Sequence, residues 1–150
     1  MKTSEQIEQD LKKAQKAKDE VSLTTLRMLK SALHNQEISL KQKELKDGEV
    51  LKVVATEVKK HKDSIEAYRQ GERGDLAKKE EVELAILEKY LPEQLGDEEI
   101  RRVVAEILDK NPELKDPKAF GKVMSQVMAQ LKGQADGQIV NQIVKELINS

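Results

Sequence analysis

Apolar residues recur every three or four positions along most of this 150-residue chain. That spacing places them on one face of an α-helix, whereas a strand would show alternation of apolar and polar positions. Four such stretches occupy the first part of the chain. Their apolar positions are Ile7, Leu11 and Ala14; Leu23, Leu26, Leu29, Leu33 and Leu40; Val50, Val53, Val54, Val58, Ile65 and Tyr68; and Leu76, Ala77, Leu84, Leu87 and Leu91. The pattern predicts a multihelical N-terminal domain over residues 1–95.

Residues that favour helix ends mark the boundaries of these stretches. Thr3 stands three positions before Gln6, which is the spacing of a capping box, so the first helix is expected to run from Thr3 to about Lys18. Asp19 and Asp75 stand where the second and fourth helices should begin, and a carboxylate there can accept hydrogen bonds from free backbone N–H groups. Each boundary therefore has a local physical reason.

A second domain with three short helices is predicted over residues 96–150. Asp97 can cap its first helix, Asp116 followed by Pro117 can begin the second, and Asp136 can cap the third. The apolar positions are Ile100, Val103, Val104, Ile107 and Leu108; Phe120, Val123, Met124, Val127, Met128 and Leu131; and Ile139, Val140, Ile143, Val144, Leu147 and Ile148. The predicted fold class is all-α, and the last two helices are expected to form an antiparallel hairpin.

Two motifs in this second domain resemble a known tail domain. They are Gly121-Lys122-Val123-Met124 and Lys132-Gly133-Gln134-Ala135-Asp136, and they look like the tail domain of the B subunit of bacterial glutamyl-tRNA(Gln)/aspartyl-tRNA(Asn) amidotransferase. The segments Leu26–Ala32, Ser64–Tyr68 and Glu88–Leu95 resemble the stand-alone YqeY-like family, which combines the same tail domain with a helical N-terminal domain. The resemblance covers nearly the whole chain, which is too short to hold the catalytic part of the amidotransferase subunit.

The resemblance implies a role with tRNA. In the amidotransferase the tail domain is thought to hold the outer elbow of tRNA by its shape and backbone. Carried over, Lys122, Lys132 and the turn containing Gly133 become the candidate RNA-binding residues, with Lys118 and Lys145 as further cations. The turn is also expected to present backbone N–H groups, which can bind phosphate at a helix end. The implied partners are tRNA and an aminoacyl-tRNA enzyme or amidotransferase, and the chain is not expected to catalyse amide transfer alone.

Composition limits the classes of partner. The chain has 27 Lys and Arg against 28 Asp and Glu, which excludes a strongly basic nucleic-acid binder, and DNA is not an expected partner. Only 2% of the residues are aromatic, too few for a platform on which single-stranded bases stack. Cysteine is absent and no stretch is apolar enough for a secretory signal or a membrane span. A cytoplasmic protein without a membrane partner is therefore predicted.

Residues for catalysis or metal binding are sparse. His34 and His61 lie on different predicted helices, and Glu57 precedes His61 by four positions, which is the spacing of a helix-borne ligand pair. A structural two-metal site would need more His and Glu than this, so no metal and no cofactor is predicted. No nucleophile and base occur in a recognisable arrangement, and the Gly71–Gly74 segment lacks the lysine of a phosphate-binding loop. No catalytic residue is therefore assigned.

A secondary basic face lies on the second predicted helix, where Arg27, Lys30 and His34 follow at steps of three and four. Such a stripe can contact phosphates, but the surrounding carboxylates favour a solvated helix face. The alternative to an RNA-binding module is a helical protein–protein adaptor with no RNA role. An adaptor should depend on exposed apolar residues of the N-terminal helices, whereas an RNA binder should depend on lysines and on salt.

Overall fold

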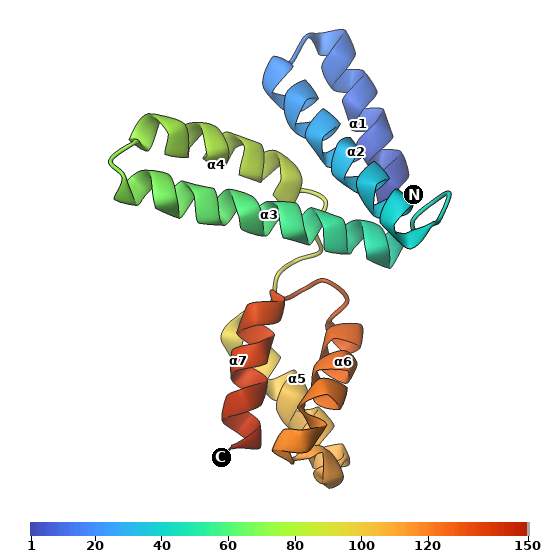
Figure 1. Ribbon diagram of the computed structural model, residues 1–150, viewed down its shortest axis with the longest axis vertical. Coiled ribbons are helices and arrows are strands. Elements are labelled where there is room, and N and C mark those ends of the chain that lie inside the picture. Colours follow the sequence, from blue (N-terminus) through green and yellow to red (C-terminus); the bar gives the residue numbers. More distant parts are fainter. Residues whose placement is uncertain (150) are drawn as a thin grey trace. The chain divides into compact units, whose positions relative to one another are not determined.

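The computed structural model describes residues 1–149, so residue 150, the last of the predicted second domain, lies outside the described part. Within those residues the chain forms seven α-helices and two 3₁₀ turns and contains no strand, which confirms the all-α prediction (Figure 1). The chain divides into two compact units, Met1–Leu91 and the residues from Pro92 onward. Each unit has a hydrophobic core of its own.

The first unit consists of two helix pairs (Figure 1). Helices α1 (Thr3–Ala17) and α2 (Glu20–Leu40) form one pair, and α3 (Asp47–Gln70) packs along α4 (Gly74–Glu88) in the other. The core takes its residues from all four helices and from the segments between and after them. Its buried members are Ile7, Leu26, Leu29, Leu33, Leu45, Val50, Val54, Val58, Leu87 and Tyr90. These are largely the positions that the apolar spacing predicted.

The second unit contains three packed helices, as predicted. Helix α5 (Asp97–Lys110) is followed by the 3₁₀ turns η1 (Pro112–Leu114) and η2 (Pro117–Ala119) and by the hairpin of α6 (Phe120–Leu131) and α7 (Gly137–Ile148). The buried core consists of Ile100, Val104, Ile107, Leu108, Leu114, Val123, Val127, Leu131, Val140, Ile143, Val144 and Ile148. The segment before α5 joins this unit through the Leu95 N–H, which donates to the carbonyl of Gln134 at 2.8 Å.

Two helix starts differ from the predictions, one because of a partner distant in sequence and one because of a neighbouring arginine. Asp19 caps α2 as predicted, since its carboxylate accepts from the Ser22 N–H at 3.2 Å. The predicted capping box of Thr3 is absent, because the Thr3 N–H donates to the carboxylate of Asp47, 44 residues away, at 3.0 Å. Asp75 lies inside the first turn of α4 rather than at its cap and forms an ion pair with Arg73 at 3.2 Å. Local sequence alone does not reveal the distant partner of Thr3.

The start of α6 also shows how proline acts on the chain. Asp116 accepts from the Lys118 N–H at 2.9 Å, as expected of a cap, but the three residues from Pro117 form a 3₁₀ turn. The regular α-helix begins only at Phe120. Proline at the first position of such a turn loses no hydrogen bond, because the N–H that it lacks would have had no partner. The residues predicted to begin the helix therefore form a short 3₁₀ turn that leads into α6.

Candidate functional site

The candidate RNA-binding residues lie on the α6/α7 hairpin of the second unit. The hairpin is antiparallel, so the end of α7 lies beside the start of α6, and the Lys145 Nζ atom is 5.8 Å from the centre of the Phe120 ring. Lys118 precedes that ring by two positions and Lys122 follows it by two. The structure thus places three candidate lysines at one end of the hairpin. We call Lys118, Lys122 and Lys145 the lysine end.

Lys132 and Gly133 lie at the opposite end of the same hairpin. Ten residues separate Lys122 from Lys132 along α6, which corresponds to about 15 Å at 1.5 Å per residue. The structure therefore does not bring the five candidate residues together in one patch. The lysine end and the Lys132 turn are two separate surfaces of the second unit.

The Lys132 turn uses its own polar backbone groups internally. The Lys132 N–H donates to Met128 at 3.1 Å, the Gln134 N–H donates to Leu131 at 3.0 Å, and the Gly133 carbonyl accepts from the Gln94 side chain at 3.0 Å. Gly133 has a φ of 81°, a left-handed conformation that glycine adopts without steric cost. These N–H groups are already bonded, and the role of Gly133 in this structure is to form the turn.

A backbone N–H group at the start of α7 likewise already has a hydrogen-bond partner. Asp136 caps this helix as predicted and accepts from the Gln138 N–H at 2.8 Å. Its carboxylate places a negative charge where the helix dipole would otherwise attract an anion. A phosphate would have to displace or approach that carboxylate, so the geometry favours the lysine end over the Lys132 turn as an anion-binding surface.

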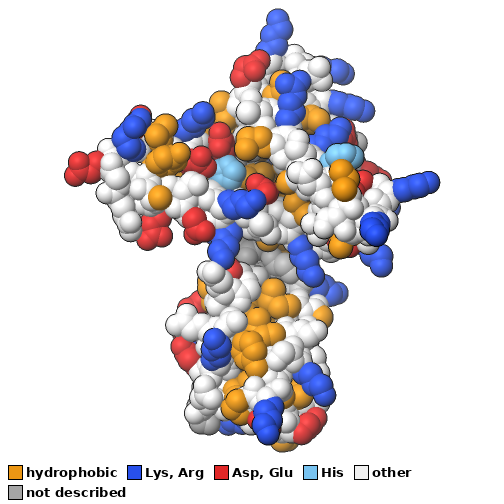
Figure 2. All heavy atoms as spheres, viewed as in Figure 1, with side chains coloured by type: hydrophobic (Ala, Val, Ile, Leu, Met, Phe, Trp, Pro, Cys, Tyr) orange, Lys and Arg blue, Asp and Glu red, His pale blue; other side chains and the backbone are white. Residues whose placement is uncertain are grey.

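Within residues 1–149, no carboxylate neutralises the charges of the lysine end. Lys118, Lys122 and Lys145 are all exposed, and none of them forms an ion pair with any residue in the range 1–149. The nearby Glu146 carboxylate pairs with Arg101 on α5 at 2.5 Å. The three lysines are therefore available to an external anion. Figure 2 shows basic and acidic side chains interspersed over the visible face of the molecule rather than a large basic field.

The secondary basic face on α2 is partly neutralised. The Lys30 Nζ atom lies 2.6 Å from a carboxylate oxygen of Glu8 on α1, so its charge is balanced within the first unit. Arg27 and His34 are exposed on the same helix. An exposed ion pair contributes little to stability, but it competes with an external anion for the lysine. The face is therefore weaker as a phosphate-binding surface than the lysine end.

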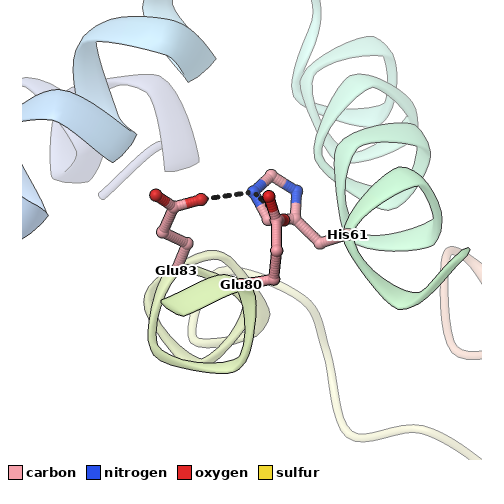
Figure 3. Close-up of side chains that lie close together, drawn as sticks. All are labelled: His61, Glu80 and Glu83. Carbon is pink, nitrogen blue, oxygen red and sulfur yellow. Dashed lines mark hydrogen bonds and ion pairs between the residues drawn. The ribbon is translucent and has the colours of Figure 1, made fainter. Parts of the chain in front are cut away.

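His61 has partners that the sequence analysis missed. Its Nε2 atom lies 3.1 Å from a carboxylate oxygen of Glu83 and 3.5 Å from one of Glu80, both on α4 (Figure 3). Glu57, whose spacing from His61 is that of a ligand pair, contributes only its backbone carbonyl, at 2.9 Å from the His61 Nδ1 atom. Residue 72 lies in the connection between α3 and α4, and His61 and Glu83 are equally far from it in sequence. In an antiparallel pair of helices such residues lie opposite each other, so this spacing could have identified the pair.

The comparison with known families agrees with this architecture. The model of the family described as Yqey-like protein matches residues 4–148, almost the entire chain. The chain belongs to the Yqey-like protein family. This finding confirms the predicted membership of the YqeY-like family.

Relatives of this family member occur in yeasts. A Kluyveromyces lactis protein named "Altered inheritance of mitochondria protein 41, mitochondrial" is 37% identical over 123 residues, which cover 78% of this chain and 66% of that protein. Its namesake in Lachancea thermotolerans is 34% identical over the same coverage, and the one in Saccharomyces cerevisiae strain YJM789 is 39% identical over 82 residues, or 55% of this chain and 44% of that protein. The chain thus spans just under two thirds of the first two relatives.

The names of these relatives contradict the prediction of a cytoplasmic protein, because the three proteins described above are named as mitochondrial. The prediction used the lack of an apolar N-terminal segment and of cysteine. A missing apolar segment argues only against a secretory signal, since mitochondrial targeting segments are amphipathic and rich in Arg and Ser. These sequence features therefore could not separate the two compartments. No helix in the described residues is long and apolar enough to cross a membrane.

Proposed function

We propose that this member of the Yqey-like family is a tRNA-binding module that works with an aminoacyl-tRNA enzyme or amidotransferase and does not catalyse a reaction alone. The observation that supports this function most is the lysine end, where three exposed lysines that have no carboxylate partner among residues 1–149 lie around one end of the α6/α7 hairpin. The resemblance of this unit to the amidotransferase tail domain supports tRNA as the ligand.

The chemistry of the lysine end suits the backbone of a folded RNA. Ammonium groups on flexible stems act as point charges for phosphates and do not read base edges. Structured RNA is recognised mainly through its phosphates, its 2′-hydroxyl groups and its shape. The module is therefore expected to bind many tRNAs with similar affinity, and the associated enzyme would supply the selectivity.

The number of lysines sets how strongly salt weakens this binding. Three phosphate contacts give a slope of about −2 to −3 in a plot of log affinity against log salt concentration, from 0.7–0.9 counterions released per contact. Raising the salt from about 50 to 200 mM should then lower the affinity roughly 20- to 40-fold. Binding of this kind is weak, salt-sensitive and independent of anticodon sequence.

The test is a titration of fluorescently labelled bulk tRNA, followed by anisotropy at low salt. The variant Lys118→Glu/Lys122→Glu should lower the affinity by at least about tenfold, because two of the three contacts are replaced by repulsion. The control Lys12→Glu/Lys16→Glu makes the same change in net charge on exposed positions of α1. Equal losses in both variants would mean that only net charge matters and would contradict the assignment of the lysine end.

A protein–protein adaptor is the second candidate function, and exposed apolar residues on α2 favour it. Val21, Met28 and Ile38 are 45%, 56% and 63% exposed. Isolated exposed apolar residues are common on soluble proteins, so the observation supports this function less than the lysine end supports RNA binding. Replacing Met28 and Ile38 with Ser should leave tRNA binding unchanged if the RNA function is correct. Absence of any tRNA binding at low salt would instead favour the adaptor.

A further inference from the structure

A compact group of three possible metal ligands lies between α3 and α4 of the first unit. His61 on α3 faces Glu80 and Glu83, which are three positions apart on α4 and therefore lie on the same side of that helix (Figure 3). One ligand atom from each residue lies within 4.8 Å of the others. The side chains of His61, Glu80 and Glu83 are 11%, 22% and 13% exposed, so the group is largely shielded from water.

The hydrogen bond between His61 and the Glu57 carbonyl determines which nitrogen of the imidazole ring is an acceptor. The Nδ1 atom of His61 lies 2.9 Å from the Glu57 carbonyl oxygen, which can only accept, so Nδ1 must carry a proton. In the neutral ring, Nε2 then presents a lone pair. That lone pair points at carboxylate oxygens of Glu83 and Glu80, which are also acceptors, at 3.1 and 3.5 Å.

A neutral imidazole in this arrangement leaves its inner nitrogen without a donor. His61 is only 9% exposed as a residue, so most of its ring is shielded from bulk water. A cation placed between the three groups would bond to the lone pair of the ring nitrogen and to both carboxylates. A second proton on the ring leaves the group with one net negative charge in a shielded place, whereas a divalent cation balances both carboxylates.

We propose that His61, Glu80 and Glu83 form a binding site for a divalent transition-metal ion of the Zn²⁺ type. Metal–ligand bonds of 2.0–2.2 Å in a tetrahedron separate neighbouring ligand atoms by about 3.3–3.6 Å. The observed separations of 3.1 and 3.5 Å from the His61 Nε2 atom are close to this value. The two glutamate oxygens lie within 4.8 Å of one another, so closure around an ion would bring them nearer together while the imidazole stays in place.

The chemistry of the ligands selects the class of ion. One imidazole with two carboxylates suits Zn²⁺, Mn²⁺ or Fe²⁺, while Ca²⁺ and Mg²⁺ prefer oxygen ligands alone. The Glu57 carbonyl holds the outer ring nitrogen, which is how metal-binding histidines are commonly oriented. Three protein ligands leave a position for water, and the bound ion would link α3 to α4. This site is in the first unit, so its test does not depend on RNA binding.

The experiment is a calorimetric titration of the full chain, stripped of metal with a chelator, with zinc chloride. We expect one ion per chain and a rise of roughly 11–22 °C in the unfolding temperature of the first unit at a hundredfold excess of free Zn²⁺ over Kd. Glu83→Gln and His61→Gln should each weaken binding at least tenfold. The control His34→Gln removes the other histidine, which is exposed, and should bind as the parent does.

Nuclear magnetic resonance of the two imidazole side chains in the unaltered protein keeps the test decisive if a variant fails to fold. Zn²⁺ should shift the Nε2 signal of His61 and leave the signals of His34 in place. Binding with equal shifts of both histidines, binding that survives Glu83→Gln and His61→Gln, or no saturable binding by the folded chain would each overturn the proposal.

Discussion

The hydrogen bond between Tyr90 and Asp10 offers a sharp test of the packing of the first unit. The Tyr90 hydroxyl donates to an Asp10 carboxylate oxygen at 2.5 Å, and the Lys89 Nζ atom lies 3.2 Å from the same oxygen. These contacts join α1 to the residues that follow α4, 80 positions away in sequence. Tyr90 is 7% exposed, so Tyr90→Phe keeps the buried ring and removes only the hydroxyl group.

A hydrogen bond to a charged group contributes about 1.5–3 kcal/mol to stability. Lys89 remains beside Asp10 in the variant, so we expect the lower value, about 1.5 kcal/mol. For a unit of this size the unfolding temperature should fall by roughly 6–12 °C. Both tyrosines, Tyr68 and Tyr90, lie in the first unit and the chain has no tryptophan, so tyrosine fluorescence during thermal unfolding reports on this unit.

The pH dependence of the effect follows from the two pKa values. Burial alone would raise the pKa of Asp10, but the hydrogen bonds from Tyr90 and Lys89 outweigh it and hold that pKa below its ordinary value of 3.8. The stabilisation is thus complete above pH 3.8 and is lost as the pH falls through the lowered value in the folded state. Burial and Asp10 raise the pKa of Tyr90 above 10.0, so its contribution is lost only as the pH rises above that value.

The stability difference between the parent and Tyr90→Phe should therefore be constant from about pH 5 to 9 and should shrink below about pH 4. Tyr68→Phe is the matched control, because the Tyr68 hydroxyl forms no hydrogen bond within the described chain. An equal loss in the two variants would refute the reasoning. So would a Tyr90→Phe effect as large at pH 3 as at pH 7.

Two further predictions concern the backbone. Asp19→Ala should lower the free energy of unfolding by about 1 kcal/mol in urea denaturation, because α2 loses its cap, while Asp63→Ala on the exposed face of α3 should change it little. Gly133→Ala should destabilise the chain by about 1–2 kcal/mol, since its φ of 81° strains a side chain. Gly48→Ala, where an added Cβ would meet nothing within 4 Å, should not destabilise the chain; a loss equal to that of Gly133→Ala would contradict the argument.

The fold was largely predictable because apolar spacing along a helix depends on local sequence. The stripes of Leu26, Leu29 and Leu33 and of Val123 and Val127 are buried as the period requires. A helix start was predictable where the capping carboxylate is close in sequence and no distant residue bonds to the same N–H group, as at Asp19. At Thr3 the donor is satisfied by Asp47 from the start of another helix, and such a contact appears only once the helices are packed.

The candidate sites were less predictable, because they depend on which helices face each other. The predicted α6/α7 hairpin already implies that Lys122 and Lys132 lie at opposite ends, although both belong to motifs of the resemblance. The spacing within one helix pairs His61 with Glu57, whereas the carboxylate partners of His61 come from α4. The internal bonds of the Lys132 turn could not be foreseen, since Gln94, from the segment before α5, supplies one of them.

The central claim is that the lysine end contacts RNA phosphates, and the most direct measurement is the salt dependence of tRNA affinity. Anisotropy titrations at several salt concentrations should give a slope of about −2 to −3 for the parent chain. The slope for the variant Lys118→Gln/Lys122→Gln should be less negative than the parent slope by about 2. The slope for Lys132→Gln should equal that of the parent. A parent slope near zero, or a larger change with Lys132→Gln than with the double variant, would contradict the account.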